Sequence, residues 1–140
     1  MKAISQDVLF YQSLGRLFYA IAASDKKVHE TEIKTLKRIV KKIWTQDMDQ
    51  IEFIFEWLSK NDENPFICFN DFVTYKKDHE KRITLYIKKL IWETANLIAN
   101  AVSGKNKSEL ILLSKLKLNL QDYWVVGYFN NLIMLPTKVL

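Results

Sequence analysis

Three carboxylates that can do chemistry together lie within eight residues: Asp25, Glu30 and Glu32. They fall on a loop and on the first turn of the helix after it, where clustered oxygen ligands can hold Ca²⁺ or Mg²⁺. The alternative is electrostatic, with Glu30 and Glu32 complementing a helix N-terminus and Asp25 solvated in the loop. Lys26 and Lys27 beside them would repel a cation. The spacing also differs from that of an EF-hand loop.

Other residue types with catalytic potential are scarce. The two histidines, His29 and His79, stand fifty residues apart, and we expect both at the surface. Cys68 is the only cysteine, and its apolar neighbours predict a buried, inert thiol. We find no glycine-rich phosphate loop and no Ser-His-Asp or Cys-His pattern, so we expect a protein that is not an enzyme. A metal-dependent enzyme that assembles acidic residues from distant segments is an alternative.

Four basic residues recur at helical spacing: Lys34, Arg38, Lys41 and Lys42. Such a stripe can contact phosphates on nucleic acid or lipid. No aromatic residue interleaves with it and no nucleic-acid-binding motif is present, so we expect a solvated helix face and no nucleic-acid partner. Trp44, Trp57 and Trp92 fall on or beside apolar stripes, which predicts that they belong to the core.

The elements that must position these residues are helices, because apolar residues recur every three or four positions through most of the chain. We expect helices over about 5–24, through 33–43, over 47–60, over 70–77 with Asn70 as its cap, over 83–103 and through 110–120. Pro65 and the residue before it resist helix, so 61–65 is expected to be a break. The fold class is all-α, a compact bundle of about six to seven helices.

Composition agrees with one helical domain over residues 1–140. The chain is 49% hydrophobic and 13% aromatic, enough for a sizeable core, and its 3 Gly and 2 Pro are too few for a sandwich or barrel. The net charge of +5 is modest. We see no signal peptide and no stretch of about 18 uninterrupted apolar residues, so we expect no transmembrane segment and a cytoplasmic location.

The C-terminal segment, residues 121–140, is a separate feature, because Tyr123 to Thr137 contain no charged residue. We expect it to close on the core or to serve in self-association, since an exposed apolar patch usually marks an interaction surface. Peripheral contact with a membrane is the alternative.

The same local pattern occurs twice, with an offset of 77 residues. Ile21-Ala22 ends one helix and Ile98-Ala99 ends another, and each is followed by a short turn. The next helices carry Glu32 and Glu109 at the third position after a potential cap, where a carboxylate can complete a capping box. Leu36 and Leu113 are also equivalent. We therefore expect two similar helical hairpins packed on each other.

The stretch from Ala22 to Glu32 resembles the TerB-like family of tellurite-resistance-associated proteins, whose loop reads roughly Ala-Asp-Gly-Lys-Val, a few polar residues and then Glu. The second hairpin resembles that family's second, degenerate copy, and the resemblance covers about residues 5 to 120. It implies an all-helical bundle that binds divalent metal through loop carboxylates, here Asp25, Glu30 and Glu32. It also implies interaction modules in stress-response systems and membrane-anchored co-chaperones. Lys26 stands where the family has Gly, and 102–104 lack the expected Asp.

These patterns together favour a non-enzymatic, TerB-like helical binding module in stress-response or envelope-associated signalling. Asp25, Glu30 and Glu32 form its candidate metal site, for Ca²⁺ or Mg²⁺. The alternative is a cytosolic homo-oligomeric protein that assembles through its C-terminal segment and has no ligand site.

Overall fold

The structure, a computed structural model, describes residues 6–24, 28, 30–44, 48–102 and 107–120. Every regular element in those ranges is helical. Six α-helices and one 3₁₀ turn follow in this order: α1 Gln6–Ala22, α2 Glu30–Ile43, α3 Met48–Lys60, α4 Pro65–Asp78, η1 Glu80–Arg82, α5 Leu85–Val102 and α6 Lys107–Asn119. The expected all-α bundle is confirmed. None of these helices has the length and apolar character needed to cross a membrane.

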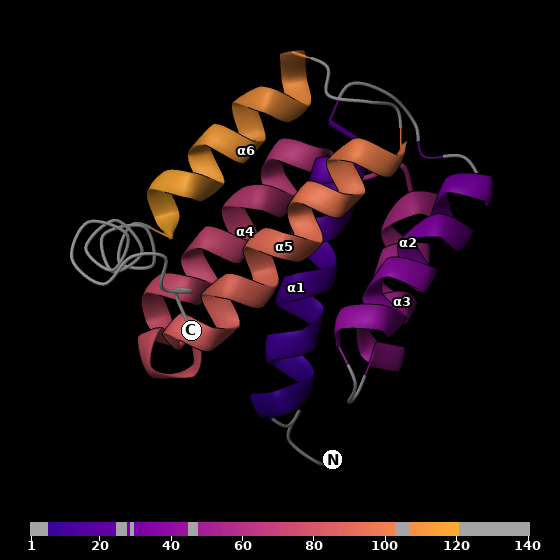
Figure 1. The fold of residues 1–140 in the computed structure, drawn as a ribbon. Helices are drawn as coiled ribbons and strands as arrows, with labels where there is room; N and C mark the ends of the chain where they lie inside the picture. The colour runs from indigo at the N-terminus through magenta and orange to yellow at the C-terminus, as the bar shows by residue number, and fades with distance from the viewer. Residues whose placement is uncertain (1–5, 25–27, 29, 45–47, 103–106, 121–140) are drawn as a thin grey trace.

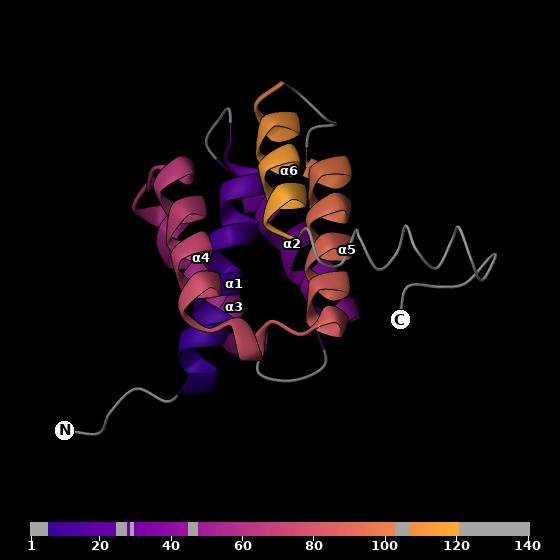
Figure 2. The same ribbon diagram turned by 90° about the vertical axis from the view of Figure 1, so that its left-hand side faces the viewer.

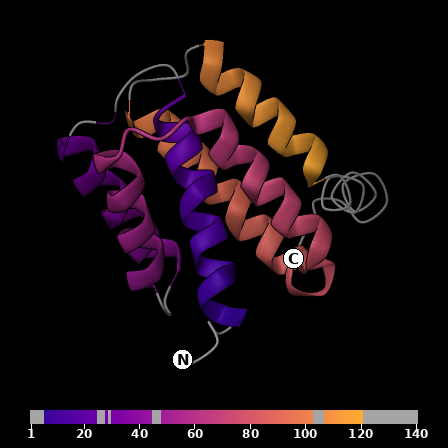
Figure 3. The ribbon, with the colours of Figure 1, turned by 180° about the vertical axis from the view of Figure 1, so that it is seen from behind.

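Helix α1 runs through the centre of the bundle. It packs against α3 and α4 on one side and against α5 and part of α6 on the other. Figure 1 shows α5 in front of α1, and the view from behind in Figure 3 shows α1 between α3 and α4. Figure 2 shows α6 beside α5. Because neighbours surround α1, Leu14, Leu17, Phe18 and Ile21 are completely buried.

The apolar stripes read from the sequence form one core. The inward residues expected of the second and third helices are buried or half-buried, among them Leu36 and Val40 on α2 and Ile51 and Phe55 on α3. The buried side chains of all six helices belong to a single hydrophobic cluster. The described part of the chain therefore packs around one core.

Gly15 lets α1 and α3 approach closely. A Cβ atom at this position would collide with Cγ2 of Ile54 and would lie 3.1 Å from the carbonyl oxygen of Ile51. Only a residue without a side chain fits here. Helix α1 therefore packs closely against α3 near its own midpoint.

The expected start of the fourth helix is wrong. Helix α4 begins at Pro65, and Asn64 is its cap, with its side-chain oxygen accepting hydrogen bonds from the backbone N–H of Phe66 at 2.8 Å and of Ile67 at 3.2 Å. Asn70, the expected cap, lies inside the helix. Proline breaks a helix interior but suits the first helical position, where its missing N–H would have no partner in any case.

The residues of the repeated pattern occupy equivalent positions within their own helices. Ile21 and Ile98 are both completely buried, and Glu32 and Glu109 are each the third residue of their helix. Within the described residues, however, α2 makes most of its contacts with α5 and α3 and few with α1. The two halves are therefore interleaved, and the arrangement as two self-contained hairpins stays a prediction.

Candidate functional site

The candidate metal residues are only partly within the described structure. Asp25 lies outside the described residues. Glu30 is the first residue of α2 and is exposed, whereas Glu32 is half-buried in the same turn. Among the described residues no group of three or more His, Cys, Asp or Glu side chains is placed to hold a metal ion. A site that includes Asp25 stays a prediction.

Glu30 opens onto a groove between α2 and α3 with a volume of about 470 Å³. The groove is lined by residues from both helices: Glu30, Ile33, Lys34, Lys37, Glu56 and Lys60. Three ammonium groups and two carboxylates therefore share this surface around one apolar side chain. A divalent cation would meet net repulsion here, whereas an acidic ligand would be attracted.

One ion pair crosses the groove, between the Nζ atom of Lys37 and the Oε1 atom of Glu56. The hydrogen bond from Lys37 lowers the pKa of Glu56, and the same bond raises the pKa of Lys37. Both side chains are more than a third exposed, so solvent screens the pair and its contribution to stability is small. Within the pair the charges of Lys37 and Glu56 offset each other, so the positive charge of the groove comes from Lys34 and Lys60.

Two aromatic residues on α3 stand beside this groove. Phe53 is 61% exposed and Trp57 is 48% exposed. On a helix, residues three or four positions apart are neighbours, so Phe53 lies next to Glu56 and Trp57, and Trp57 lies next to Lys60. An aromatic surface thus continues from the α3 edge of the α2–α3 groove.

The expectation that all three tryptophans belong to the core is wrong for Trp57. Trp44 is buried and donates a hydrogen bond from Nε1 to Oγ1 of Thr94 at 2.9 Å, and Trp92 is half-buried. Trp57 is 48% exposed and lies on the flank of α3, next to Ile54. The buried face is already filled by four residues: Ile51, Ile54, Phe55 and Leu58. At about 100° per residue, Phe53 falls opposite these buried residues and Trp57 falls beside Ile54, so the sequence signal for exposure was clear at Phe53 and weak at Trp57.

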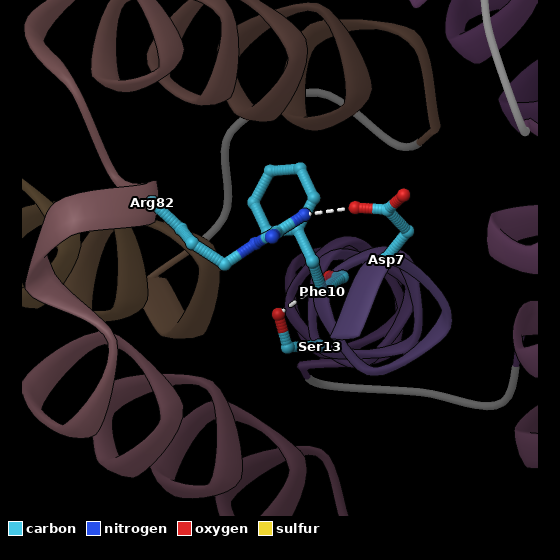
Figure 4. Close-up of polar contacts among 4 residues, drawn as sticks. All are labelled: Asp7, Phe10, Ser13 and Arg82. Atoms are coloured by element: carbon cyan, nitrogen blue, oxygen red, sulfur yellow. Dashed lines mark hydrogen bonds and ion pairs between the residues drawn. The ribbon is translucent and has the colours of Figure 1, made fainter. Parts of the chain in front are cut away.

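A second cluster joins the start of α1 to η1, and no local pattern of residues predicts it. The guanidinium of Arg82 lies 5.4 Å from the centre of the Phe10 ring and pairs with the carboxylate of Asp7, as Figure 4 shows. Ser13 donates a hydrogen bond to the Phe10 carbonyl at 2.7 Å. Arg82 ends the charged stretch 76–82, and these contacts show that the stretch is not wholly exposed to solvent. A cation over an aromatic face and an exposed ion pair stabilise the fold modestly.

His79 is part of the same end of the bundle. We expected a surface residue, but His79 is half-buried, with its ring stacked on that of Tyr75 at 4.1 Å. Its Nδ1 atom lies 3.0 Å from the Tyr75 carbonyl oxygen. These contacts give His79 a packing role between α4 and η1.

Cys68 is buried, as expected. Burial raises the pKa of its thiol to about 11. The thiol is therefore protonated at neutral pH and is a poor nucleophile and metal ligand.

Comparisons with protein-family models, with curated proteins and with solved structures find no match for this chain. The TerB-like resemblance therefore rests on residues 22–32 and on the order of the helices.

Proposed function

We propose that this protein is a non-enzymatic helical module that binds another protein through the α2–α3 groove and the adjoining aromatic pair, Phe53 and Trp57. The observation that carries the proposal is the placement of two largely exposed aromatic side chains beside a groove with three lysines. Tryptophan is enriched among the residues that contribute most to protein–protein binding, and large exposed apolar side chains on a rigid helix mark such surfaces.

The chemistry of the surface defines the partner. Phe53 and Trp57 offer an apolar contact, while Lys34 and Lys60 attract carboxylates at its edge. A segment with an apolar anchor flanked by Asp or Glu fits both features. Nucleic acid fits less well, because Glu30 and Glu56 offset two of the three lysines in the groove and leave too little positive charge for a series of phosphate contacts.

The proposal includes a TerB-like role in stress-response or envelope-associated signalling. Its support is the sequence motif of residues 22–32 together with the all-helical bundle. The metal site at Asp25, Glu30 and Glu32 belongs to this part of the proposal. Unfolding measured with and without Ca²⁺ or Mg²⁺ tests it, because a metal that binds only the folded state must raise the melting temperature. An unchanged melting temperature at millimolar metal would contradict the metal site.

The surface itself is tested by capture of partners from cells of the source organism, quantified by mass spectrometry. The double variant Phe53→Ala with Trp57→Ala should capture at least five-fold less of the partner than the wild-type bait does. Tyr86→Ala is the matched control, because Tyr86 is a 57% exposed aromatic residue on α5. Equal capture by all three baits would show that the α3 surface does not bind the partner.

Charge reversal separates the groove from the aromatic pair. Lys34→Glu with Lys60→Glu should slow association and reduce its dependence on salt, because rim charges mainly act on the association rate. Binding that is unaffected by this change would remove the acidic partner from the proposal.

A further inference from the structure

Helix α6 has two apolar faces, and only one of them is covered by the described structure. Leu112, Leu113, Leu116 and Leu120 are buried against the bundle, where α6 contacts α1 and α5. At about 100° per residue, Ile111 and Leu118 fall on the opposite side of the helix, and Leu110 falls on the flank beside Leu113. An apolar stripe along one side of a helix normally faces a packing partner.

The uncovered side, which we name the outer face of α6, is unusual within this molecule. Leu118 is 71% exposed, Leu110 47% and Ile111 43%, so α6 exposes more large apolar residues than any other described helix. Together with Ser114 and Lys115 they line a shallow hollow of about 530 Å³. Leaving these side chains in water has a free-energy cost that a covering segment would remove.

The chain itself continues directly from this helix. The last described residue, Leu120, donates its backbone N–H to the carbonyl of Leu116 at 2.9 Å, and the C-terminal segment 121–140 starts at the next residue. Residues 123–137 carry no charge and include Tyr, Trp, Phe, Val, Leu, Ile and Met. This composition matches the outer face of α6, where the three apolar side chains lie around Ser114 and Lys115 is at the edge.

The segment is also long enough. The 13 residues of α6 span about 20 Å at 1.5 Å per residue. The 15 uncharged residues 123–137 would span about 22 Å as a helix, and more if extended. In either conformation the segment can turn back after α6 and reach Leu110.

We propose that the C-terminal segment of the same chain binds the outer face of α6 and completes the bundle. A tethered segment has an effective concentration of the order of millimolar, so the chain's own segment outcompetes that of a second copy at micromolar protein. The proposal concerns a different surface from the α2–α3 groove and does not depend on the proposed function.

Hydrogen–deuterium exchange of the full chain, followed by mass spectrometry of peptides from 123–137, tests this assignment. In the wild-type protein these peptides should exchange at least ten-fold more slowly than an unstructured peptide. The exchange rate should be the same at 1 and at 50 µM protein, because tethering makes the contact independent of protein concentration. Leu118→Glu should abolish most of that protection. Leu97→Glu is the matched control, since Leu97 is 43% exposed on α5 and lines a different groove.

Three results would overturn the proposal. The first is exchange of 123–137 at the unstructured rate in the wild-type protein. The second is equal protection in the wild type and in Leu118→Glu. The third is protection that rises with protein concentration, which would assign the outer face of α6 to a second copy. A reciprocal variant, Ile133→Glu, should speed the exchange of peptides from α6 without changing those from α3.

Discussion

Helices α2 and α6 occupy equivalent places in the repeated pattern, yet they present opposite outer surfaces. Each follows a short connection, each has a glutamate at its third position, and each buries an equivalent leucine, Leu36 or Leu113. The outer side of α2 carries lysines and an arginine, whereas that of α6 carries Leu110, Ile111 and Leu118. The two helices therefore start with the same local pattern but differ on their outer sides, which are charged and solvated in α2 and apolar and uncovered by the described helices in α6.

The largest expected effect tests whether both helices are equally part of the core. Leu36→Ala and Leu113→Ala remove side chains that are 0% and 5% exposed, and each should lower the free energy of unfolding by about 2–5 kcal/mol, because both create a cavity. Urea unfolding measures this directly. A loss below about 1 kcal/mol for either variant would mean that its helix is only loosely attached.

The next effect concerns the first helices of the repeat. Gly15 on α1 corresponds to Trp92 on α5 at the 77-residue offset, so the two halves pack differently at this point. Gly15→Ala gains about 1 kcal/mol of helix propensity but should still destabilise the protein by about 1–3 kcal/mol, because its Cβ meets Ile54 and the Ile51 backbone.

A double-mutant cycle with Ile54→Ala checks the cause of that loss. Removing the Ile54 side chain should make Gly15→Ala less costly. If the cost of Gly15→Ala is the same in both backgrounds, the close approach of α1 and α3 is not its origin.

A smaller effect is expected at the two helix starts. Glu109 is completely buried and Glu32 is half-buried. Glu109→Ala should therefore cost about 2 kcal/mol and Glu32→Ala about 1 kcal/mol, since a buried polar contact is worth more than a solvated one. Thermal unfolding of both variants against Glu93→Ala, an exposed position on α5, makes the comparison. Equal losses at positions 32 and 109 would contradict the difference in burial.

The smallest effect is electrostatic and concerns the ion pair that Lys37 on α2 forms with Glu56 on α3. It tests the charged side of α2, which contrasts with the apolar outer face of α6. In the folded protein the pKa of Glu56 lies below its ordinary value of 4.5, because Lys37 donates a hydrogen bond to the carboxylate. The stability that Glu56 contributes is therefore fully present above pH 4.5 and is lost as the pH falls through the folded pKa. The pKa of Lys37 is raised from 10.5, so its contribution is present below that value and is lost as the pH rises through the folded pKa.

Glu56→Gln should therefore destabilise the protein by less than about 1 kcal/mol at pH 7. Urea unfolding should show that the difference from wild type narrows below pH 4.5 and in 1 M salt, because protonation or screening removes the pair. A difference that is constant between pH 7 and pH 3 would assign the effect to packing.

Local sequence chemistry sufficed for most of the helices but failed at α4. The three- and four-residue spacing of apolar residues predicted α1, α3 and α5 within two residues of their observed ends. At α4 the same reasoning treated Pro65 as a break, although Asn64 before it is a good cap and proline is favoured at the first helical position. The information was present in the sequence, and the cap was assigned to the wrong asparagine.

The candidate surface was less predictable. The residues Glu30, Lys34 and Lys37 were visible on the predicted helix, but the groove exists only because Glu56 and Lys60 come from a helix that packs beside it. The place of Arg82 over Phe10 depends on a contact between residues 72 positions apart, which no local pattern encodes.

Local residue patterns are enough to predict that the chain is helical, which side of most helices faces inward and where Glu32 and Glu109 stand in their helices. These properties follow from side-chain periodicity and from the free N–H groups at helix starts, which act over only a few residues. Three features can be read only from the packed helices: α2 lies on α5 and α3, α3 approaches α1 closely at Gly15, and α6 keeps exposed apolar residues that no described helix covers. Such features depend on which helices meet, and that depends on the packing of the whole core.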